Sequence, residues 1–267
     1  MEKIELFGKT IEFISYENKE DLISKDKSTY EKVKNSVFYE FDEMMSSIMG
    51  QMPGFVLYGD VFLDKNDDPD KTKMEHLGEL LGKTHKEWFI FTGNLENEGH
   101  LEISDFDRVS VLGDFKTDSL VNDQGLFWAD GESHIQDGLY FDSNNGGFTL
   151  LNLKTAPGLI ATMANVFEVN LKSKYFYDPI FRIDFKDDPQ SPHQENILSK
   201  LDPEHPHPTK VTKQDLVDFL GHYEKTEEVT NLENEDDDDV LDWIMDLVSI
   251  GAAGVFVEFL DKKYSKK

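Results

Sequence analysis

An apolar phrase recurs along the middle of the chain at a nearly constant interval. Each copy contains a short apolar run, a Gly or its substitute, an acidic or amide residue and usually another apolar residue. The anchors of the four copies, which lie 20, 18 and 20 positions apart, are Gly93, Gly113, Gly131 and Leu151. A period near 20 residues is typical of a solenoid, in which one repeat cannot bury its apolar face alone and stacks on its neighbours.

A second, shorter apolar piece lies between successive phrases. These pieces are residues 101–103, 120–121, 139–141 and 159–160. Two strands per repeat, with Gly, Asn and Asp at the corners, suit a coil that turns sharply and pairs with the coils on either side. We therefore predict an α+β fold, built on a short parallel β-helix of about four or five coils with helical N- and C-terminal caps. Residues 167–169 would begin a fifth coil or a closing strand.

The segments before the repeats predict a hairpin, a helix and a first rung. Residues 3–15 alternate between apolar and polar positions on both sides of Gly8, which is typical of a β-hairpin. Residues 30–48 carry apolar side chains at helical spacing, which predicts an amphipathic helix. Residues 55–63 read as a buried strand that already contains the Gly59-Asp60 pair, so we expect it to form the first rung.

An acidic loop follows this first rung, and its oxygen-bearing residues match the ligand positions of an EF-hand loop. They are Asp64, Asn66, Asp68, Asp70, Thr72 and Glu75. The match is incomplete, because Pro69 stands where the sharp turn needs Gly and a strand precedes the loop where a helix belongs. The preferred interpretation is a solvated acidic loop leading into a short helix at residues 74–81, with calcium binding as the alternative.

Residues 175–208 predict a strand followed by a Pro- and His-rich linker. Phe181, Ile183 and Phe185 alternate as in a strand, and five prolines come after them. The candidate zinc ligands in the linker are Asp202, Glu204, His205 and His207. Structural zinc sites normally have four ligands at recognisable spacing, and no such set is present, so an extended linker is preferred to a metal site.

Two helices are expected after the linker. Thr212 and Asp215 mark the start of the first, and Gly221 lies near its end. Residues 240–260 form a long apolar run, which predicts one helix that packs on the open end or a side of the β-helix. A membrane-spanning helix is not preferred, because Asp242, Asp246 and Glu258 interrupt the run.

These elements divide the chain into four regions. Residues 1–54 form the N-terminal hairpin and helix cap, and residues 55–170 form the β-helix core. Residues 171–210 form the strand and linker, and residues 211–267 form an acidic helical region.

The charge balance limits the function classes. The 267 residues contain 54 Asp and Glu against 27 Lys and Arg, so the formal net charge is −27. Such a surface repels phosphate backbones and anionic membranes, which excludes nucleic acid and lipid surfaces as expected partners. The chain has no Cys, which excludes disulfides and thiolate chemistry. The first residues lack the features of a secretory signal, so a cytoplasmic location is expected.

One acidic block stands out near the C-terminus. It consists of Glu227, Glu228, Glu233, Glu235, Asp236, Asp237, Asp238 and Asp239, and residues 226–239 include no Lys or Arg. Part of the block precedes a predicted helix, whose N-terminus favours negative charge. The rest is the candidate binding region for a basic protein.

The repeat region resembles a known kind of protein. The residues that carry the resemblance are Val111-Leu112-Gly113-Asp114-Phe115-Lys116-Thr117 and Asn152-Leu153-Lys154-Thr155-Ala156-Pro157. They are similar to uncharacterised bacterial proteins with Gly-Asp-Leu repeats and, more distantly, to the polymer-forming bactofilins. The resemblance covers residues 88–169 and implies a β-helix, but no active-site residues. The flanking helices depart from the bactofilin pattern, which argues against filament formation.

Familiar catalytic motifs are absent from the sequence, and no cofactor is expected. The preferred function is a noncatalytic acidic protein that binds a basic protein, for example a bacterial immunity protein that neutralises a toxin. One alternative is a carbohydrate-active enzyme that uses acids on adjacent coils, with Asp114, Glu132 and Asn152 at equivalent repeat positions. A self-assembling structural protein is the other alternative, and the oligomeric state stays open.

Overall fold

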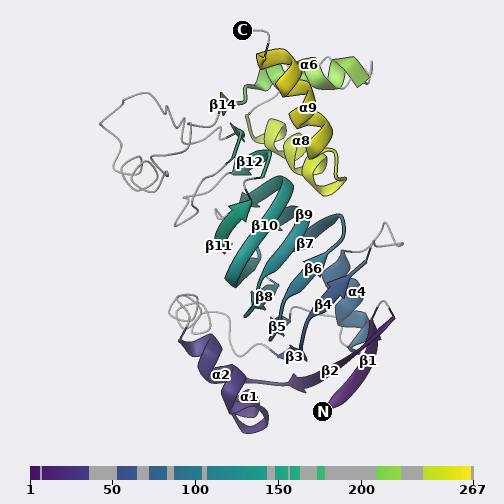
Figure 1. The fold of residues 1–267 in the computed structure, drawn as a ribbon, viewed down its shortest axis with the longest axis vertical. Helices are drawn as coiled ribbons and strands as arrows, with labels where there is room; N and C mark the ends of the chain where they lie inside the picture. Colours follow the sequence, from purple (N-terminus) through teal and green to yellow (C-terminus); the bar gives the residue numbers. More distant parts are fainter. Residues whose placement is uncertain are drawn as a thin grey trace.

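The computed structural model describes residues 1–6, 8–35, 53–64, 72–82, 87–103, 107–142, 148–155, 157–162, 173–177, 209–223 and 237–265. These residues form a β-solenoid of about three turns together with six helices. The long axis of the molecule runs from an N-terminal hairpin at one end to three helices at the other (Figure 1).

Each coil of the solenoid has three sides, and parallel strands stack along each side. The first side contains β3 (Gly54–Tyr58), β5 (Trp88–Phe91), β8 (Arg108–Val111) and the starts of β10 (Leu126–Asp142) and β11 (Phe148–Thr155). The second side contains β4 (Val61–Leu63), β6 (Leu95–Asn97), the start of β9 (Phe115–Asp123) and later parts of β10 and β11. The third side contains β7 (His100–Ile103), the ends of β9 and β10, β12 (Leu159–Thr162), β13 (Tyr175–Tyr177) and β14 (Thr209–Lys210).

The solenoid class is as predicted, but the number of sides and turns differs from the sequence expectation. The second side was missed because it is short. In β6 only Glu96 faces outward between buried Leu95 and Asn97, so the strand has no apolar run of its own. The solenoid has about three turns rather than the predicted four or five coils. Among the described residues, the first coil has strands on two sides, and β13 and β14 continue the third side.

Register places large apolar residues above one another inside the solenoid. On the first side Phe55 pairs with Phe89, which pairs with Val109, which in turn pairs with Phe127. The rings of Phe55 and Phe89 stack with their centroids 5.9 Å apart, and Phe115 from the second side lies 4.7 Å from Phe127. All five are buried, so the interior is a packed core.

The N-terminal hairpin is confirmed. Strand β1 (Glu2–Leu6) pairs antiparallel with β2 (Lys9–Tyr16), and Gly8 in the turn has φ +76°. Strand β2 continues antiparallel onto β3, so the hairpin extends the first side of the solenoid.

Two short helices follow the hairpin, α1 (Lys19–Lys25) and α2 (Lys27–Lys34). Asp26 accepts the Thr29 N–H at 3.0 Å and so caps α2. The helix predicted at residues 30–48 is therefore only partly observed: α2 ends at Lys34 and is capped by Asn35. Residues 36–52 lie outside the described residues. Tyr30 and Val33 of α2 belong to the apolar cluster on the outer surface of the first side.

Helix α4 (Lys73–Leu80) confirms the helix predicted at residues 74–81. Its Met74 and Leu77 are buried in the solenoid core, and α4 contacts β7. The Lys73 ammonium donates to the buried Asn97 Oδ1 at 2.8 Å. Helix α4 therefore follows the two strands of the first coil and covers the core beside the third side.

Helix α6 (Lys213–Tyr223) lies where the sequence predicts it, but the long helix predicted at residues 240–260 is wrong. The chain forms α8 (Asp237–Ser249) and α9 (Ala253–Tyr264), bent by 113°. Gly251 has φ +73° and donates to Val248 O at 3.2 Å, while Ala252 donates to Leu247 O at 2.8 Å. This is a Schellman motif, which ends a helix with a left-handed residue.

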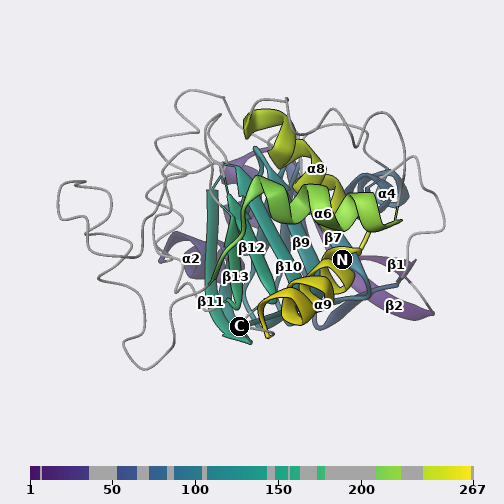
Figure 2. The same ribbon diagram turned by 90° about the horizontal axis from the view of Figure 1, so that it is seen from above.

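Helices α8 and α9 pack on the outer surface of the third side. Val121, Tyr140 and Leu159 of that side form one apolar cluster with Val248 and Phe256, among others. Two glycines of the solenoid permit the close approach: a Cβ on Gly138 would lie 2.8 Å from Ala253 Cβ, and one on Gly158 would lie 2.8 Å from Val257 Cγ2. Figure 2 shows the three C-terminal helices gathered over this part of the strands.

Within the part of the chain that the structure describes, no single helix has both the length and the apolar composition to cross a membrane. The bent pair of Asp242–Ser249 and Ala253–Tyr264 meets the length and composition criteria only when the two segments are taken together. The residues predicted as a fifth coil at 167–169, and the strand around Phe181, Ile183 and Phe185, lie outside the described residues.

Candidate functional site

The first corner of the solenoid carries a ladder of acidic and amide side chains. Asn94 donates its N–H to Asp60 Oδ1 at 2.9 Å, Asp114 donates to Asn94 Oδ1 at 2.8 Å, and Glu132 donates to Asp114 Oδ1 at 2.8 Å. Each side chain on this ladder therefore binds the backbone of the next coil. The residue after each corner Gly is an acid or an amide because the position needs a hydrogen-bond acceptor.

The corner glycines stack directly on one another. Gly113 donates to Gly93 O at 3.2 Å, and Gly131 donates to Gly113 O at 3.0 Å. A Cβ on Gly113 would lie 2.7 Å from the Gly93 carbonyl carbon and oxygen, closer than atoms can pack. The spacing between coils therefore requires Gly here, which is why the phrase recurs in the sequence.

The second side presents a row of outward side chains in register. Phe62, Glu96, Lys116, His134 and Thr155 follow one another across successive strands. Lys116 pairs with Glu96 at 2.6 Å, and His134 Nδ1 lies 2.8 Å from Thr155 Oγ1. The hydrogen bond and charge of Glu96 raise the pKa of Lys116. Two neighbouring pairs in this row, Glu96 with Lys116 and His134 with Thr155, therefore bind each other.

The structure brings the three candidate glycosidase residues onto successive coils. Asp114 is the acceptor for Glu132 N–H, and Glu132 lies opposite Asn152 in the parallel register. The Glu132 carboxylate also lies 3.5 Å from the exposed Lys154 ammonium. All three candidates are exposed, and the hydrogen bond to Asp114 and the ion pair of Glu132 give these two acids a role in the fold.

A carboxylate pair lies at the second corner, beside the start of α9. Asp118 accepts the Gly99 N–H at 2.9 Å. Partial burial, and then the charge of Asp118, raise the pKa of Asp137. A Cβ on Gly254 would lie 3.2 Å from the Asp137 carboxyl carbon, and Ala252 gives α9 no side-chain cap. Asp137 thus places negative charge near a helix N-terminus, where it is favourable.

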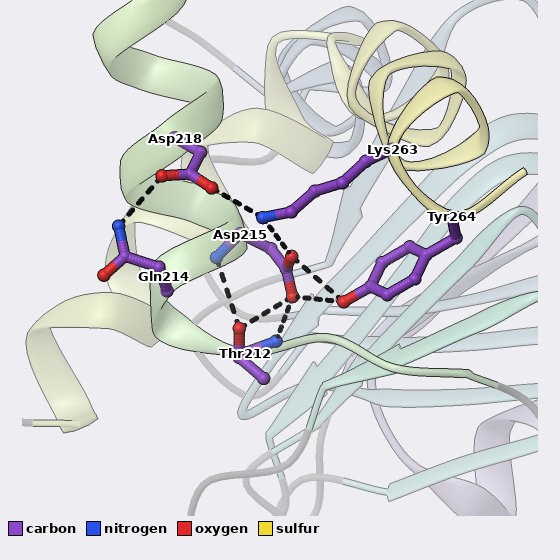
Figure 3. Close-up of polar contacts among 6 residues, drawn as sticks. All are labelled: Thr212, Gln214, Asp215, Asp218, Lys263 and Tyr264. Carbon is purple, nitrogen blue, oxygen red and sulfur yellow. Dashed lines mark hydrogen bonds and ion pairs between the residues drawn. The ribbon is translucent and has the colours of Figure 1, made fainter. Parts of the chain in front are cut away.

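The most highly connected polar group is the Asp215 cluster, formed by Thr212, Asp215, Asp218, Lys263 and Tyr264 (Figure 3). Asp215 is 1% exposed. Its carboxylate accepts the Thr212 N–H and hydroxyl, each at 2.7 Å, and the Tyr264 hydroxyl at 2.9 Å. Lys263 contacts Asp215 at 2.8 Å and Asp218 at 2.6 Å. The cluster therefore joins the start of α6 to the end of α9.

Burial disfavours the charge of Asp215, but the hydrogen bonds from Lys263, Thr212 and Tyr264 outweigh burial and hold its pKa below the usual range. The Thr212 and Asp215 pair is the helix start that the sequence predicted. Lys263 and Tyr264 were not predicted, since nothing in the spacing links residues almost 50 positions apart. A carboxylate saturated with donors and held in its charged form stabilises the fold and is a poor general base.

The remaining sequence candidates are described only in part. The structure describes the backbone of Asp237, Asp238 and Asp239, which begin α8, and the other five members of the acidic block lie outside the described residues. The same holds for the zinc candidates Asp202, Glu204, His205 and His207, and for the calcium candidates Asn66, Asp68 and Asp70.

Two of the remaining calcium candidates have another role. Glu75 donates its N–H to Thr72 Oγ1 at 3.1 Å, and the Glu75 carboxylate accepts the Thr72 N–H at 2.7 Å, which forms the capping box of α4. Asp64 is exposed directly after β4. Across the described ranges, no group of three or more His, Asp or Glu side chains is placed to hold a metal ion.

Comparison of the chain with protein-family models, with curated proteins and with solved structures finds no match. Function is therefore inferred from the charge and the surface geometry of the chain itself.

Proposed function

We propose that this protein is a noncatalytic binding protein whose acidic surface recognises a basic protein partner. The net charge of −27 is the observation that carries the proposal. A surface with this excess of carboxylates attracts a cationic partner over about a Debye length, roughly 10 Å at 0.1 M salt, and speeds its association.

The acidic block is the proposed binding region. Its eight carboxylates fall within residues 227–239 with no Lys or Arg among them, so the negative charge of this stretch is not offset from within. Its last three residues begin α8, where negative charge also stabilises the helix N-terminus. Charge at this place can therefore serve both the helix and a partner.

The partner class that fits is a cationic toxin, which an immunity protein would neutralise by charge and shape. Tight neutralisation of this kind relies on electrostatic complementarity for rapid association and for rejection of other partners.

Calorimetric titration of the purified chain with the basic product of a neighbouring gene tests the proposal. The test variant changes Asp236, Asp237, Asp238 and Asp239 to Asn, which keeps the capping ability of the side chains. The matched control changes Glu2, Glu5, Glu12 and Glu17 to Gln, four acids in or directly after the β1–β2 hairpin. Figure 1 shows this hairpin at the end of the molecule opposite the C-terminal helices.

We expect the test variant to bind at least about tenfold more weakly at low salt and with a shallower salt dependence. The control should lose much less affinity. The proposal fails if the wild-type chain does not bind, or if the test variant keeps the affinity and the salt dependence of the wild type.

A further inference from the structure

Two exposed apolar side chains lie on either side of the turn between α8 and α9 in the sequence. The described residues contain four exposed large hydrophobic side chains, and two of them are Ile250, which is 72% exposed, and Val255, which is 45% exposed. The other two, Met1 and Leu80, belong to the N-terminal half of the sequence. Val248 and Phe256 of the same two helices are buried against the solenoid, whereas Ile250 and Val255 lie on the surface.

Acidic side chains flank the pair on both helices. Asp242 and Asp246 precede Ile250 by two turns and one turn of α8, and both are exposed. Glu258 follows Val255 by three residues on α9, and its side chain is 74% exposed. We call the set of Asp242, Asp246, Ile250, Val255 and Glu258 the α8–α9 elbow. An apolar centre with a charged rim is the usual anatomy of a protein-binding surface.

Like charges are crowded at the elbow. Partial burial, and then the charge of Asp242, raise the pKa of Asp246. The one cation that contacts a carboxylate of the elbow in the described contacts is Lys262, which lies 4.0 Å from Glu258. A cationic group arriving beside Asp246 would relieve this repulsion, so the charge of the elbow complements a basic surface.

The elbow is also held in place. The Schellman motif at Gly251 fixes the turn, and the contacts of Gly138 with Ala253 and Val248 hold both helices against the third side. A surface already fixed in one shape loses little conformational freedom on binding. Ser249, the residue of α8 next to Ile250, lies about 15 Å along the helix axis from Asp239, the last residue of the acidic block, at roughly 1.5 Å per residue, so one partner can reach both.

We infer that the α8–α9 elbow is a docking surface for a basic protein, with Ile250 and Val255 filling an apolar depression whose rim carries Lys or Arg. The inference rests on the proposed function and adds to it the place and the chemistry of contact. The acidic block then attracts the partner, and the elbow gives the complex its specific contact.

Two labelled peptides probe the elbow in the full chain. One is an amphipathic helix-forming peptide of Lys and Leu, and the other is an oligolysine of the same charge. Fluorescence anisotropy at low salt measures the affinity of each for the wild type, for Ile250→Ser, for the double variant Ile250→Ser with Val255→Ser, and for Asp242→Asn with Asp246→Asn. Leu80→Ser, at a 47% exposed apolar position on α4, is the matched control.

The wild type is expected to bind the Lys-Leu peptide more tightly than oligolysine. The double Ser variant should lose about tenfold in affinity for the Lys-Leu peptide and none for oligolysine, because only apolar contact is removed. The Asn variant should weaken both. The single Ile250→Ser variant removes a side chain that is mostly in water, so loss of folding cannot explain its effect.

The outcomes separate the two proposals. If the wild type binds neither peptide at low salt, the acidic surface does not recognise basic chains, and the proposed function fails with the elbow. If both peptides bind and the elbow variants match Leu80→Ser, the docking surface lies elsewhere, and the elbow inference fails alone.

Discussion

Replacement of Gly113 by Ala tests the idea that the corner glycines are required by the spacing between coils. The φ of Gly113 does not lie in the left-handed region, so the new methyl group adds no backbone strain of its own. Its only obstacle is the coil beside it: the Cβ would lie 2.6 Å from Asn94 Oδ1 and 2.7 Å from the Gly93 carbonyl group, where ordinary contact begins at about 3.4 Å.

The coils must therefore separate by about 0.7 Å at this corner, which is the difference between the 3.4 Å of ordinary contact and the 2.7 Å to the Gly93 carbonyl group. The Gly113 to Gly93 hydrogen bond, already 3.2 Å long, and the Asp114 to Asn94 bond would then be broken or greatly weakened. Two hydrogen bonds at about 1 kcal/mol each, together with about 1–3 kcal/mol for overpacking, predict a loss of about 2–4 kcal/mol after the smaller entropic gain of Ala.

Gly99→Ala is the matched control, since Gly99 has φ +82° and no atom would lie within 4 Å of its Cβ. It should lose about 1 kcal/mol from the left-handed conformation alone. Urea unfolding followed by circular dichroism gives the free energy of unfolding of both variants. A Gly113→Ala loss equal to or smaller than the Gly99→Ala loss would refute the close-stacking explanation of the repeat.

Three further predictions concern the C-terminal helices. Asp215→Asn should lower the free energy of unfolding at pH 7 by about 2–3 kcal/mol, because the donors around Asp215 lose a charged acceptor. Because the pKa of Asp215 is lowered in the folded state, the charged carboxylate stabilises the fold at pH values above the unfolded pKa of about 3.9, and this stabilisation is lost as pH falls through the folded pKa. The free energy of unfolding of the wild type should therefore fall more steeply in acid than that of the variant. An equal dependence of stability on pH in the two proteins would contradict the cluster's role. Gly251→Ala should lose about 1 kcal/mol in thermal unfolding because its φ is +73°, and no loss would contradict the Schellman turn. Gly221→Ala, exposed in α6 with no atom within 4 Å of its Cβ, should instead gain about 0.5–1 kcal/mol in the same assay, and a loss would show that α6 is packed more tightly there.

Local patterns predicted the parts of the fold that depend on neighbours in sequence. The Gly-Asp phrase marked the corner because the same hydrogen bond recurs on each coil, and Thr212 with Asp215 marked the start of α6 because a capping box spans only three residues. The turn at Gly8 was likewise predicted from its two flanking strands.

Contacts between distant segments had no such signal. Asp137 meets the start of α9 from more than 100 positions away, and Lys263 reaches Asp215 from 48 positions away. The turn between α8 and α9 was missed for a different reason. Gly251 lies between apolar Ile250 and Ala252, and a single Gly does not show in the sequence whether a helix continues or ends. The second side was not predicted because its strands are short: β6 has only three residues, and its single alternation of buried and exposed positions, at Glu96, does not distinguish a strand from a corner in the sequence.

The antiparallel attachment of the hairpin has a consequence for growth of the solenoid. To extend the first side, a coil from a second copy would have to pair with β3 in parallel, as β5 does on the other edge of β3. The remaining edge of β3 is already occupied by β2, which pairs with it antiparallel. The edge beyond it belongs to β1, where charged Lys3 and Glu5 alternate with apolar residues. Charged side chains on an edge strand oppose further pairing. The hairpin therefore blocks addition of further coils to the first side, and end-to-end polymerisation through this end of the solenoid would require β2 to separate from β3 first.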